Sequence, residues 1–147
     1  MIYQLIYYSQ SKTASDSPQL VKNWGDILGA AHRHNARNDI TGFLIFDSRF
    51  FVQILEGDRD KVSETYNRIK MDNRHASPMI INVRDVKARS FDGWDMGSAI
   101  RTPAMQEIFR AQGLEGPLNP ATLKGSQVIQ LARYLAAYQL ACQDKSA

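Results

Sequence analysis

Apolar residues gather in five short segments along the first 100 residues of the chain. The segments are IYQLIYY (2–8), ITGFLIF (40–46), FFVQILEG (50–57), MIINVRDVKARSF (79–91) and WDMGSAI (94–100). Those at 40–46 and 50–57 are apolar almost throughout, which is typical of strands covered on both faces. Only Asp47, Ser48 and Arg49 separate them, so the pattern predicts a hairpin.

Two stretches between these segments carry apolar residues at helical spacing. The first has Ser17 as its predicted N-cap and Pro18 as its first helical residue. Its apolar face consists of Leu20, Trp24, Ile27, Leu28 and Ala31. The second helix is predicted to begin after an N-cap at Asp58 and to be broken by HASP (75–78), and its apolar side consists of Val62, Tyr66 and Ile69.

The order of these elements predicts an α+β fold with a ferredoxin-like sheet and two helices on one face. Strand, helix, strand, strand, helix and strand follow one another, and a further strand is expected at 94–100. C-terminal helices are predicted to cover the other face, one within 103–112 and one capped by Ser126, whose stripe is Val128, Leu131, Leu135 and Tyr138. We therefore expect one domain at residues 1–100 and a helical extension at 101–147.

Composition excludes several other classes of protein. The net charge is +3, and the basic residues are scattered among acidic ones, which does not favour nucleic-acid binding. The single cysteine, Cys142, rules out an internal disulfide framework or a cysteine zinc cluster. The first strand is predicted to begin at Ile2, which leaves no room for a signal peptide, and no apolar run reaches the roughly 20 residues of a membrane-spanning helix. We therefore expect a soluble, cytoplasmic protein that binds neither nucleic acid nor a membrane.

One polar side chain, Gln53, lies in the middle of an apolar strand. A buried amide needs partners, because each unpaired polar group costs about 1–3 kcal/mol. Asn35 continues the apolar stripe of the first helix, and Tyr7 shares a strand face with apolar neighbours. Trp94 and Met96 are predicted to share a face of the last strand. These groups are expected to converge beneath the two helices, either as a network that satisfies itself or as the polar edge of a site for a flat ligand.

Five stretches of the chain resemble, in the family's order, the BLUF domain of blue-light sensors that use flavin adenine dinucleotide (FAD). They are LIYYSQ (5–10), HNARNDITGFLIF (34–46), FFVQILEGDRDKVSETYNRI (50–69), DNRHASP (72–78) and FDGWDMG (91–97). The resemblance covers about residues 2 to 100. Flavin binding is implied by this resemblance and not by the composition or the spacing.

The resemblance also implies a role for each candidate site residue. Tyr7 matches the family's photoactive tyrosine, and Gln53 matches the glutamine that links the tyrosine to the flavin. Asn35 matches the asparagine that holds the carbonyl edge of the ring, which the preceding His34 also contacts. The other matches are Trp94 and Met96, a pair that exchange places near the glutamine, and four residues on the ribityl and phosphate side: Arg68, Asp72, Arg74 and His75. Ile27, on the apolar face of the first helix, is also expected to contact the cofactor.

The function implied is that of a blue-light photoreceptor that binds FAD, with the mononucleotide FMN as the alternative, without a covalent bond. Light excites the flavin, Tyr7 gives up an electron and a proton and then recovers them, and Gln53 ends rotated or tautomerised. A flavin carbonyl then gains a stronger hydrogen bond, and the absorption shifts to the red. Such a protein is not an enzyme and signals to a separate effector protein; a homo-oligomer, a dimer or larger, is expected.

Two other functions are compatible with the same order of elements. An acylphosphatase-like hydrolase needs an arginine in a phosphate-binding loop, whereas the loop after the first strand, SQSKTASD (9–16), holds only Lys12. An RNA-binding sheet needs exposed aromatic residues within a basic surface, whereas the apolar strands are predicted to be covered on both faces.

Overall fold

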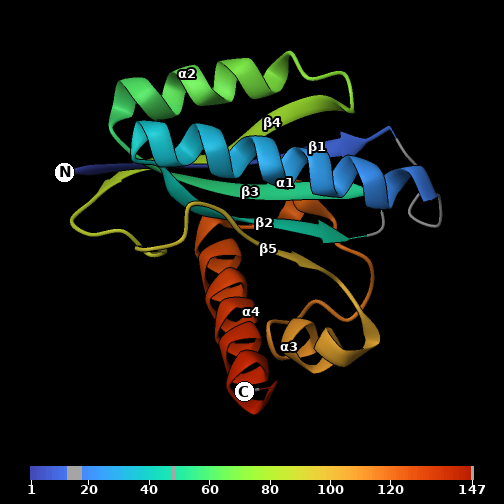
Figure 1. Ribbon diagram of the computed structural model, residues 1–147. Coiled ribbons are helices and arrows are strands. Elements are labelled where there is room, and N and C mark those ends of the chain that lie inside the picture. Colours follow the sequence, from blue (N-terminus) through green and yellow to red (C-terminus); the bar gives the residue numbers. More distant parts are fainter. Residues whose placement is uncertain (13–17, 48, 147) are drawn as a thin grey trace.

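The computed structural model describes residues 1–12, 18–47 and 49–146. Its strands form one sheet in the order β4-β1-β3-β2-β5, in which β2 and β5 run parallel and all other neighbours antiparallel (Figure 1). The strands are β1 (Ile2–Ser11), β2 (Thr41–Asp47), β3 (Phe50–Gly57), β4 (His75–Val86) and β5 (Gly97–Ile100). The sheet therefore has the ferredoxin-like arrangement that the sequence predicts, with β5 added beside β2.

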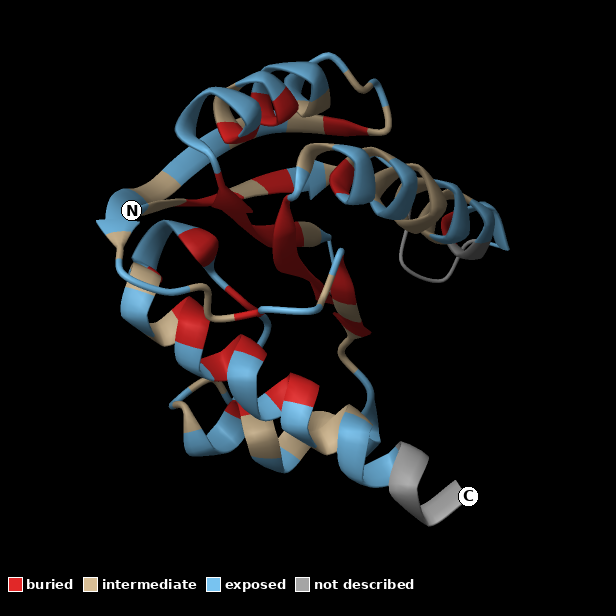
Figure 2. Cartoon of the chain, turned by 60° about the vertical axis from the view of Figure 1, so that its left-hand side comes forward, coloured by how far each residue is buried: buried red, intermediate tan, exposed pale blue. Residues whose placement is uncertain are grey.

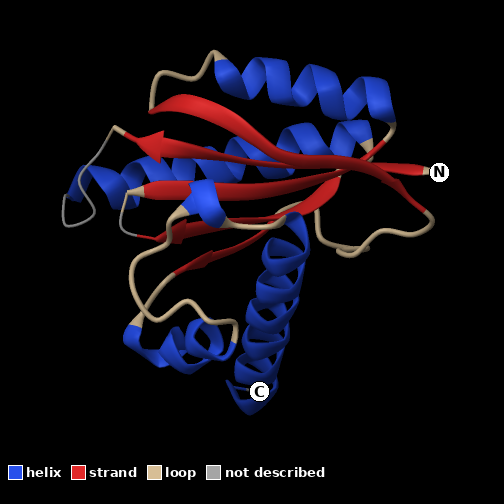
Figure 3. Cartoon of the chain, turned by 180° about the vertical axis from the view of Figure 1, so that it is seen from behind, coloured by secondary structure: helices blue, strands red, loops and turns tan. Residues whose placement is uncertain are grey.

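Helices cover both faces of this sheet. They are α1 (Pro18–Asn38), α2 (Arg59–Lys70), α3 (Gln106–Ala111) and α4 (Gly125–Ser146), with short 3-10 turns at Pro103–Met105 and Pro120–Thr122. Figures 2 and 3 show the first two helices on one side of the strands and the C-terminal pair on the other. The predicted placement of both pairs of helices is confirmed.

Strand alternation divides the core into two clusters, one on each face of the sheet. The helix-side cluster, beneath α1 and α2, contains Leu5, Tyr7, Leu44, Phe46, Phe51, Leu55 and Met96. The tail-side cluster, against α3 and α4, contains Ile6, Phe43, Ile45, Val52, Ile54 and Phe109 together with the buried stripe of α4. The central strands β2 and β3 are thus covered on both faces, and they pair as the predicted hairpin with Asp47 opposite Phe50.

The start of α2 confirms its predicted N-cap. The carboxylate of Asp58 accepts hydrogen bonds from the backbone N–H groups of Asp60 and Lys61, at 3.1 and 3.2 Å. Residues Ser17 and Ser48, named in the predicted cap of α1 and the hairpin connector, lie outside the described residues.

Other boundaries differ from the prediction. The HASP stretch is not a break between elements but the first part of β4. The strand accommodates Pro78 because the pairing with β1 shifts register at this point, where Ser77 has a positive φ of 53° and Pro78 needs no ladder hydrogen bond. Strand β4 ends at Val86, and β5 begins only at Gly97, so residues 87–96 form a loop. Ser126 lies inside α4 and does not cap it; the side chain of Gln127 accepts the N–H of Lys124 at 3.0 Å instead.

Candidate functional site

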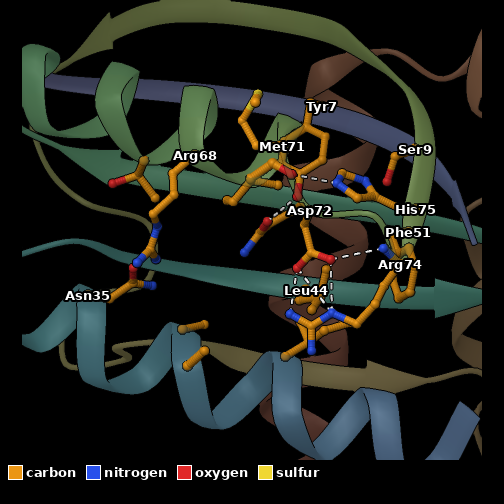
Figure 4. Close-up of a pocket in the computed structure, with 16 residues that line it drawn as sticks. Tyr7, Ser9, Asn35, Leu44, Phe51, Arg68, Met71, Asp72, Arg74 and His75 are labelled. Carbon is orange, nitrogen blue, oxygen red and sulfur yellow. Dashed lines mark hydrogen bonds and ion pairs between the residues drawn. The ribbon is translucent and has the colours of Figure 1, made fainter.

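A cavity of about 350 Å³ lies between α1, α2 and the helix side of the central strands (Figure 4). Its volume falls in the range of small-molecule sites, about 300–1,000 Å³. Among the predicted site residues, the cavity is lined by Tyr7, Ile27, Asn35, Gln53, Arg68, Asp72, Arg74 and His75, whereas His34, Trp94 and Met96 are not part of the lining. The fold therefore brings most of the predicted site residues together around one cavity.

Gln53 is buried at this cavity between two partners. Tyr7 stands opposite it on β1 and donates its phenolic hydrogen to Oε1 of Gln53. The amide nitrogen Nε2 donates to the sulfur of Met96, 3.5 Å away. Because a thioether can only accept a hydrogen bond, Met96 keeps the amide nitrogen on its own side and the oxygen toward Tyr7.

The hydroxyl of Tyr7 is held in its protonated form. Burial raises the pKa of Tyr7 well above its ordinary value of about 10, and the neighbouring Tyr66 and Asp72 raise this pKa further. The ring of Tyr66 lies against that of Tyr7, with 5.1 Å between their centroids. The site thus holds a proton at a defined position, between the phenolic oxygen of Tyr7 and Oε1 of Gln53.

Asn35 is buried at the C-terminal end of α1 and lines the same cavity. Its Nδ2 group donates to the backbone carbonyl oxygen of Asp95 at 2.7 Å. This bond orients the amide and ties α1 to the loop 87–96, which also carries Met96. Asn35 and Gln53 therefore bond adjacent residues of this loop, Asp95 and Met96.

The prediction that Trp94 and Met96 share a face of the last strand is wrong. Both residues precede β5, in a loop where strand alternation does not apply. Met96 belongs to the helix-side cluster, whereas Trp94 packs against the tail-side cluster, with its ring centroid 6.0 Å from that of Phe43. The N–H of Gly42 donates to the carbonyl of Trp94 at 3.1 Å and holds the chain where it passes from one face to the other. Only Met96 therefore stands beside Gln53.

His34 joins α1 to α2 and is not part of the cavity wall. Its Nε2 atom lies 2.8 Å from the hydroxyl of Thr65, and this hydroxyl donates its own hydrogen to the carbonyl of Lys61 at 2.7 Å. Nε2 must therefore carry the imidazole proton and donate it. Burial lowers the pKa of His34, and the nearby Arg68 and Arg37 lower it further, so the neutral imidazole is favoured.

The four residues predicted on the phosphate side all line the cavity. Asp72 and Arg74 form an ion pair at 2.5 Å, and its hydrogen bonds lower the pKa of Asp72 and raise that of Arg74. His75 makes a hydrogen bond with the carbonyl of Ile69 at 2.6 Å.

Within the described residues, no carboxylate pairs with Arg68, which Figure 4 shows on the Asn35 side of the cavity. Arg68 is thus available to an anionic or carbonyl group of a ligand.

A further cavity residue, Ser9, was missed by the reasoning from sequence. Its hydroxyl is the one buried side-chain polar atom in the described part of the chain that lacks a hydrogen-bond partner, and the residue lines the cavity. Alternation could have identified it, because Ser9 follows Tyr7 by two positions on β1 and shares its face. An unpaired buried hydroxyl is costly, so this atom favours a ligand that supplies the missing partner.

Comparison with known proteins places this chain in a family. The family model described as "Sensors of blue-light using FAD" (BLUF) matches residues 2–97. The chain belongs to the BLUF family. It is 37% identical over 114 residues to the blue light- and temperature-regulated antirepressor BluF of Escherichia coli (strain K12), a match that spans 74% of this chain and 27% of BluF. The chain therefore spans about a quarter of the length of this curated relative.

Solved structures of similar size share the fold over most of the chain. The photo-activated state of BlsA superposes with a TM-score of 0.79 at 27% identity, covering 92% of this chain and 94% of that one. The dark state of BlrB, a BLUF protein, gives a TM-score of 0.73 at 28% identity, covering 93% and 96%. The alternative of an acylphosphatase-like hydrolase is not supported by these comparisons.

The residues around the cavity fit the flavin that the family description implies. Apolar side chains can contact a ring system, the amides of Asn35 and Gln53 can bond a carbonyl edge, and Arg68 is available to a phosphate or carbonyl. The unpaired hydroxyl of Ser9 offers one more hydrogen-bonding group in the same lining.

In the described part of the chain, no helix has the length and apolar character needed to cross a membrane.

Proposed function

We propose that this BLUF chain senses blue light through a flavin held without a covalent bond in the cavity beneath α1 and α2. The observation that carries the proposal is the hydrogen bond from the Tyr7 hydroxyl to Gln53 Oε1, made by two buried residues that line this cavity. A phenol and an amide paired in this way can exchange a proton and reorganise without moving the backbone.

Each part of the cavity wall would hold a different part of the flavin. Ile27, Leu44 and Phe51 would contact the rings, because they supply apolar surface on both sides of the cavity. Asn35 and Gln53 would bond the polar edge. Asp72, Arg74 and His75 would lie along the ribityl and phosphate side, whereas Arg68, which lies on the Asn35 side of the cavity, would reach the polar edge (Figure 4). His34 would support Asn35 from the α2 side through Thr65.

The chemistry supplied by the bound flavin is the absorption of blue light and the uptake of an electron from a nearby donor. Tyr7 is the donor that this chain provides. Loss of an electron makes a phenol strongly acidic, so the phenolic proton of Tyr7 passes along the existing hydrogen bond to Oε1 of Gln53. Oε1 then carries the proton, and the amide can rotate, or it can release a proton from Nε2 toward the cavity and adopt its imidic-acid form. When Tyr7 recovers its electron and proton, the altered Gln53 presents a different hydrogen bond to the cavity.

FAD, rather than FMN, is the proposed form of the cofactor. The support for FAD is the family model that matches this chain, which is described as one of sensors that use FAD. Mass spectrometry of the compound released by heat from the purified protein tests this point. A released mass of FMN alone would contradict it.

The response would reach a separate effector protein through contacts and not through catalysis by this chain. In this proposal the sensor domain, residues 1–100, is followed by the extension 101–147, whose helices α3 and α4 pack on the tail side of the sheet. A homo-oligomer, a dimer or larger, is part of the same proposal, and size-exclusion chromatography with light scattering would test it.

The deciding experiment is the absorption spectrum of the purified, flavin-reconstituted protein in the dark and after blue light. We expect one flavin per chain and a reversible red shift of its bands. Heat or acid should release the flavin intact, because Cys142, an exposed residue of α4, lies on the other side of the sheet from the cavity. A protein without a flavin band, or a flavin band that light does not shift, would contradict the proposed function.

A further inference from the structure

A row of polar side chains crosses the tail side of the sheet and is not part of the cavity. Arg84, Gln4, Glu56 and Thr41 stand opposite one another on the adjacent strands β4, β1, β3 and β2. Nε of Arg84 donates to Gln4 Oε1 at 2.9 Å, and Nε2 of Gln4 donates to Glu56 Oε2 at 2.9 Å. Glu56 is 0% exposed. The buried carboxylate at the centre of this row has no role in the site described above.

The remaining partners of Glu56 lie in the loop 87–96. The backbone N–H of Ser90 donates to Oε2 at 2.8 Å, and that of Phe91 donates to Oε1 at 2.9 Å. The hydroxyl of Thr41 donates to Oε1 at 3.3 Å. Each carboxylate oxygen therefore receives one bond from a strand side chain and one from the loop backbone.

Arg89 strengthens the same attachment from the loop side. Its guanidinium donates to the carbonyl oxygens of Glu56 and Asp39, at 3.1 and 2.8 Å, and to the hydroxyl of Thr41 at 3.0 Å. The beginning of the loop is thereby fixed to the ends of β2 and β3. The far end of the loop brings the carbonyl of Asp95 to Asn35 and the sulfur of Met96 to Gln53.

We infer that Glu56 is a positioning residue of the light response, which holds the loop 87–96 so that Met96 remains the acceptor for the Gln53 amide. The inference rests on the proposed function. Strand β3 carries Gln53 on one face and, three residues further on, Glu56 on the other, so the switch and the anchor of its partner lie on one rigid element. If the anchor loosens, Met96 leaves its place and the orientation of the Gln53 amide is no longer fixed.

The substitution Glu56→Gln tests this with almost no change in volume. One carboxylate oxygen becomes an NH₂ group, which cannot accept a hydrogen bond. The hydroxyl of Thr41 can rotate and the amide of Gln4 can flip, but the N–H groups of Ser90 and Phe91 are fixed donors. Whichever oxygen is replaced, one loop N–H therefore faces another donor, and the loop is released at that point.

We expect Glu56→Gln to bind flavin and to keep a red shift, but to change the rate of dark recovery by about fivefold, the factor that corresponds to roughly one net hydrogen bond. Arg84→Met is the matched control, because Arg84 belongs to the same row but bonds Gln4 and, among the described residues, has no hydrogen bond to the loop 87–96. This control should recover at the rate of the unchanged protein. A lowered thermal midpoint of Glu56→Gln with an unchanged recovery rate would overturn the inference.

A double-mutant comparison separates positioning from general destabilisation. If Glu56 acts through Met96, the variant Glu56→Gln with Met96→Ala should recover at the rate of Met96→Ala alone, whereas independent effects would multiply and would overturn the inference. Arg89→Met provides a second test in case Glu56→Gln does not fold, and its effect should likewise disappear in the Met96→Ala background. A chain that shows no light-induced red shift before any substitution would instead contradict the proposed function itself.

Discussion

Arg101 and Asp47 form a buried ion pair that joins the end of the sheet to the C-terminal helices. Nη1 of Arg101 lies 2.9 Å from Oδ2 of Asp47, the last residue of β2, and each side chain is 7% exposed. The other donors of the guanidinium reach the carbonyls of Leu114, Glu115 and Gly116 and the side chain of Gln106. Since Arg101 directly follows β5, one guanidinium links the sheet, α3 and the segment that leads to α4.

Arg101→Met should be strongly destabilising, because it leaves the buried carboxylate of Asp47 without its cation. We expect a loss of about 3–5 kcal/mol in the free energy of unfolding, the usual cost of breaking a buried ion pair on one side. Urea denaturation of the flavin-loaded protein measures it. Arg110→Met is the control, since Arg110 pairs with Glu107 at an exposed position of α3, and it should change stability by less than about 1 kcal/mol. Equal losses in both variants would show that Arg101 has no special structural role.

Tyr7→Phe and Gln53→Leu should both fold, bind flavin and lose the reversible red shift. Phenylalanine keeps the buried ring and removes only the hydroxyl, and leucine has a volume close to that of glutamine without its hydrogen bonds. Such replacements can be nearly neutral for stability. The measurement is the light-minus-dark absorption spectrum at matched flavin occupancy. A normal red shift in both variants would place the switch elsewhere.

Asn35→Ala should weaken flavin binding instead of removing the light response. Asn35 lines the cavity and holds the carbonyl of Asp95, so its loss removes a ligand contact and loosens the loop 87–96. We expect the dissociation constant of the flavin to rise by about tenfold, which corresponds to roughly one to two hydrogen bonds. Titration of the apoprotein with flavin, followed by fluorescence quenching, gives this value. Unchanged affinity would show that Asn35 acts only on the loop.

The sequence predicts the elements that depend on local pattern. The hairpin between 40–46 and 50–57 follows from two apolar runs separated by three residues. Alternation places Tyr7 and Gln53 on strand faces that are expected to converge, whereas their direct link, which the structure contains, is implied only by the family resemblance. The need for partners arises because Gln53 is an amide in an otherwise apolar strand. Ser9 could have been found in the same way, since it shares the face of Tyr7.

The features that were not predicted depend on contacts between distant residues. The apolar residues within 94–100 indicate a strand, but the hydrogen bonds from Asn35 to Asp95 and from Gly42 to Trp94 hold the first part of this stretch as a loop. Trp94 and Met96 therefore lie on opposite faces of the sheet. The row containing Glu56 and Gln4 has no local signal either, because a single acidic residue at a strand end usually indicates a solvated position.

The raised pKa of Tyr7 predicts a loss of stability at alkaline pH. The folded chain keeps the phenolic proton, whereas the unfolded chain releases it above about pH 10. The free energy of unfolding should therefore fall as the pH rises beyond this point, by up to about 1.4 kcal/mol per pH unit for this group. Urea denaturation of the unchanged protein and of Tyr7→Phe at several alkaline pH values tests it. Part of the slope should remain in Tyr7→Phe, because burial also raises the pKa of Tyr66. Parallel curves for the two proteins would contradict the prediction.

Met96→Ala should keep a light-induced red shift but weaken the light-dependent change in the C-terminal helices. Met96 contacts Gln53 and immediately precedes β5, whose Ser98 carbonyl accepts a hydrogen bond from Nε2 of Gln139 in α4 at 2.5 Å. A movement of Met96 that follows the Gln53 amide can thus reach α4 through one four-residue strand. Hydrogen exchange of residues 126–142, in the dark and under blue light, reports the change in the tail. Gln139→Leu is the matched variant, because it removes the bond to β5 at a distance from the cavity; it should leave the red shift intact and reduce the exchange difference as Met96→Ala does. An undiminished light–dark difference in both variants would show that the signal leaves the sheet by another route.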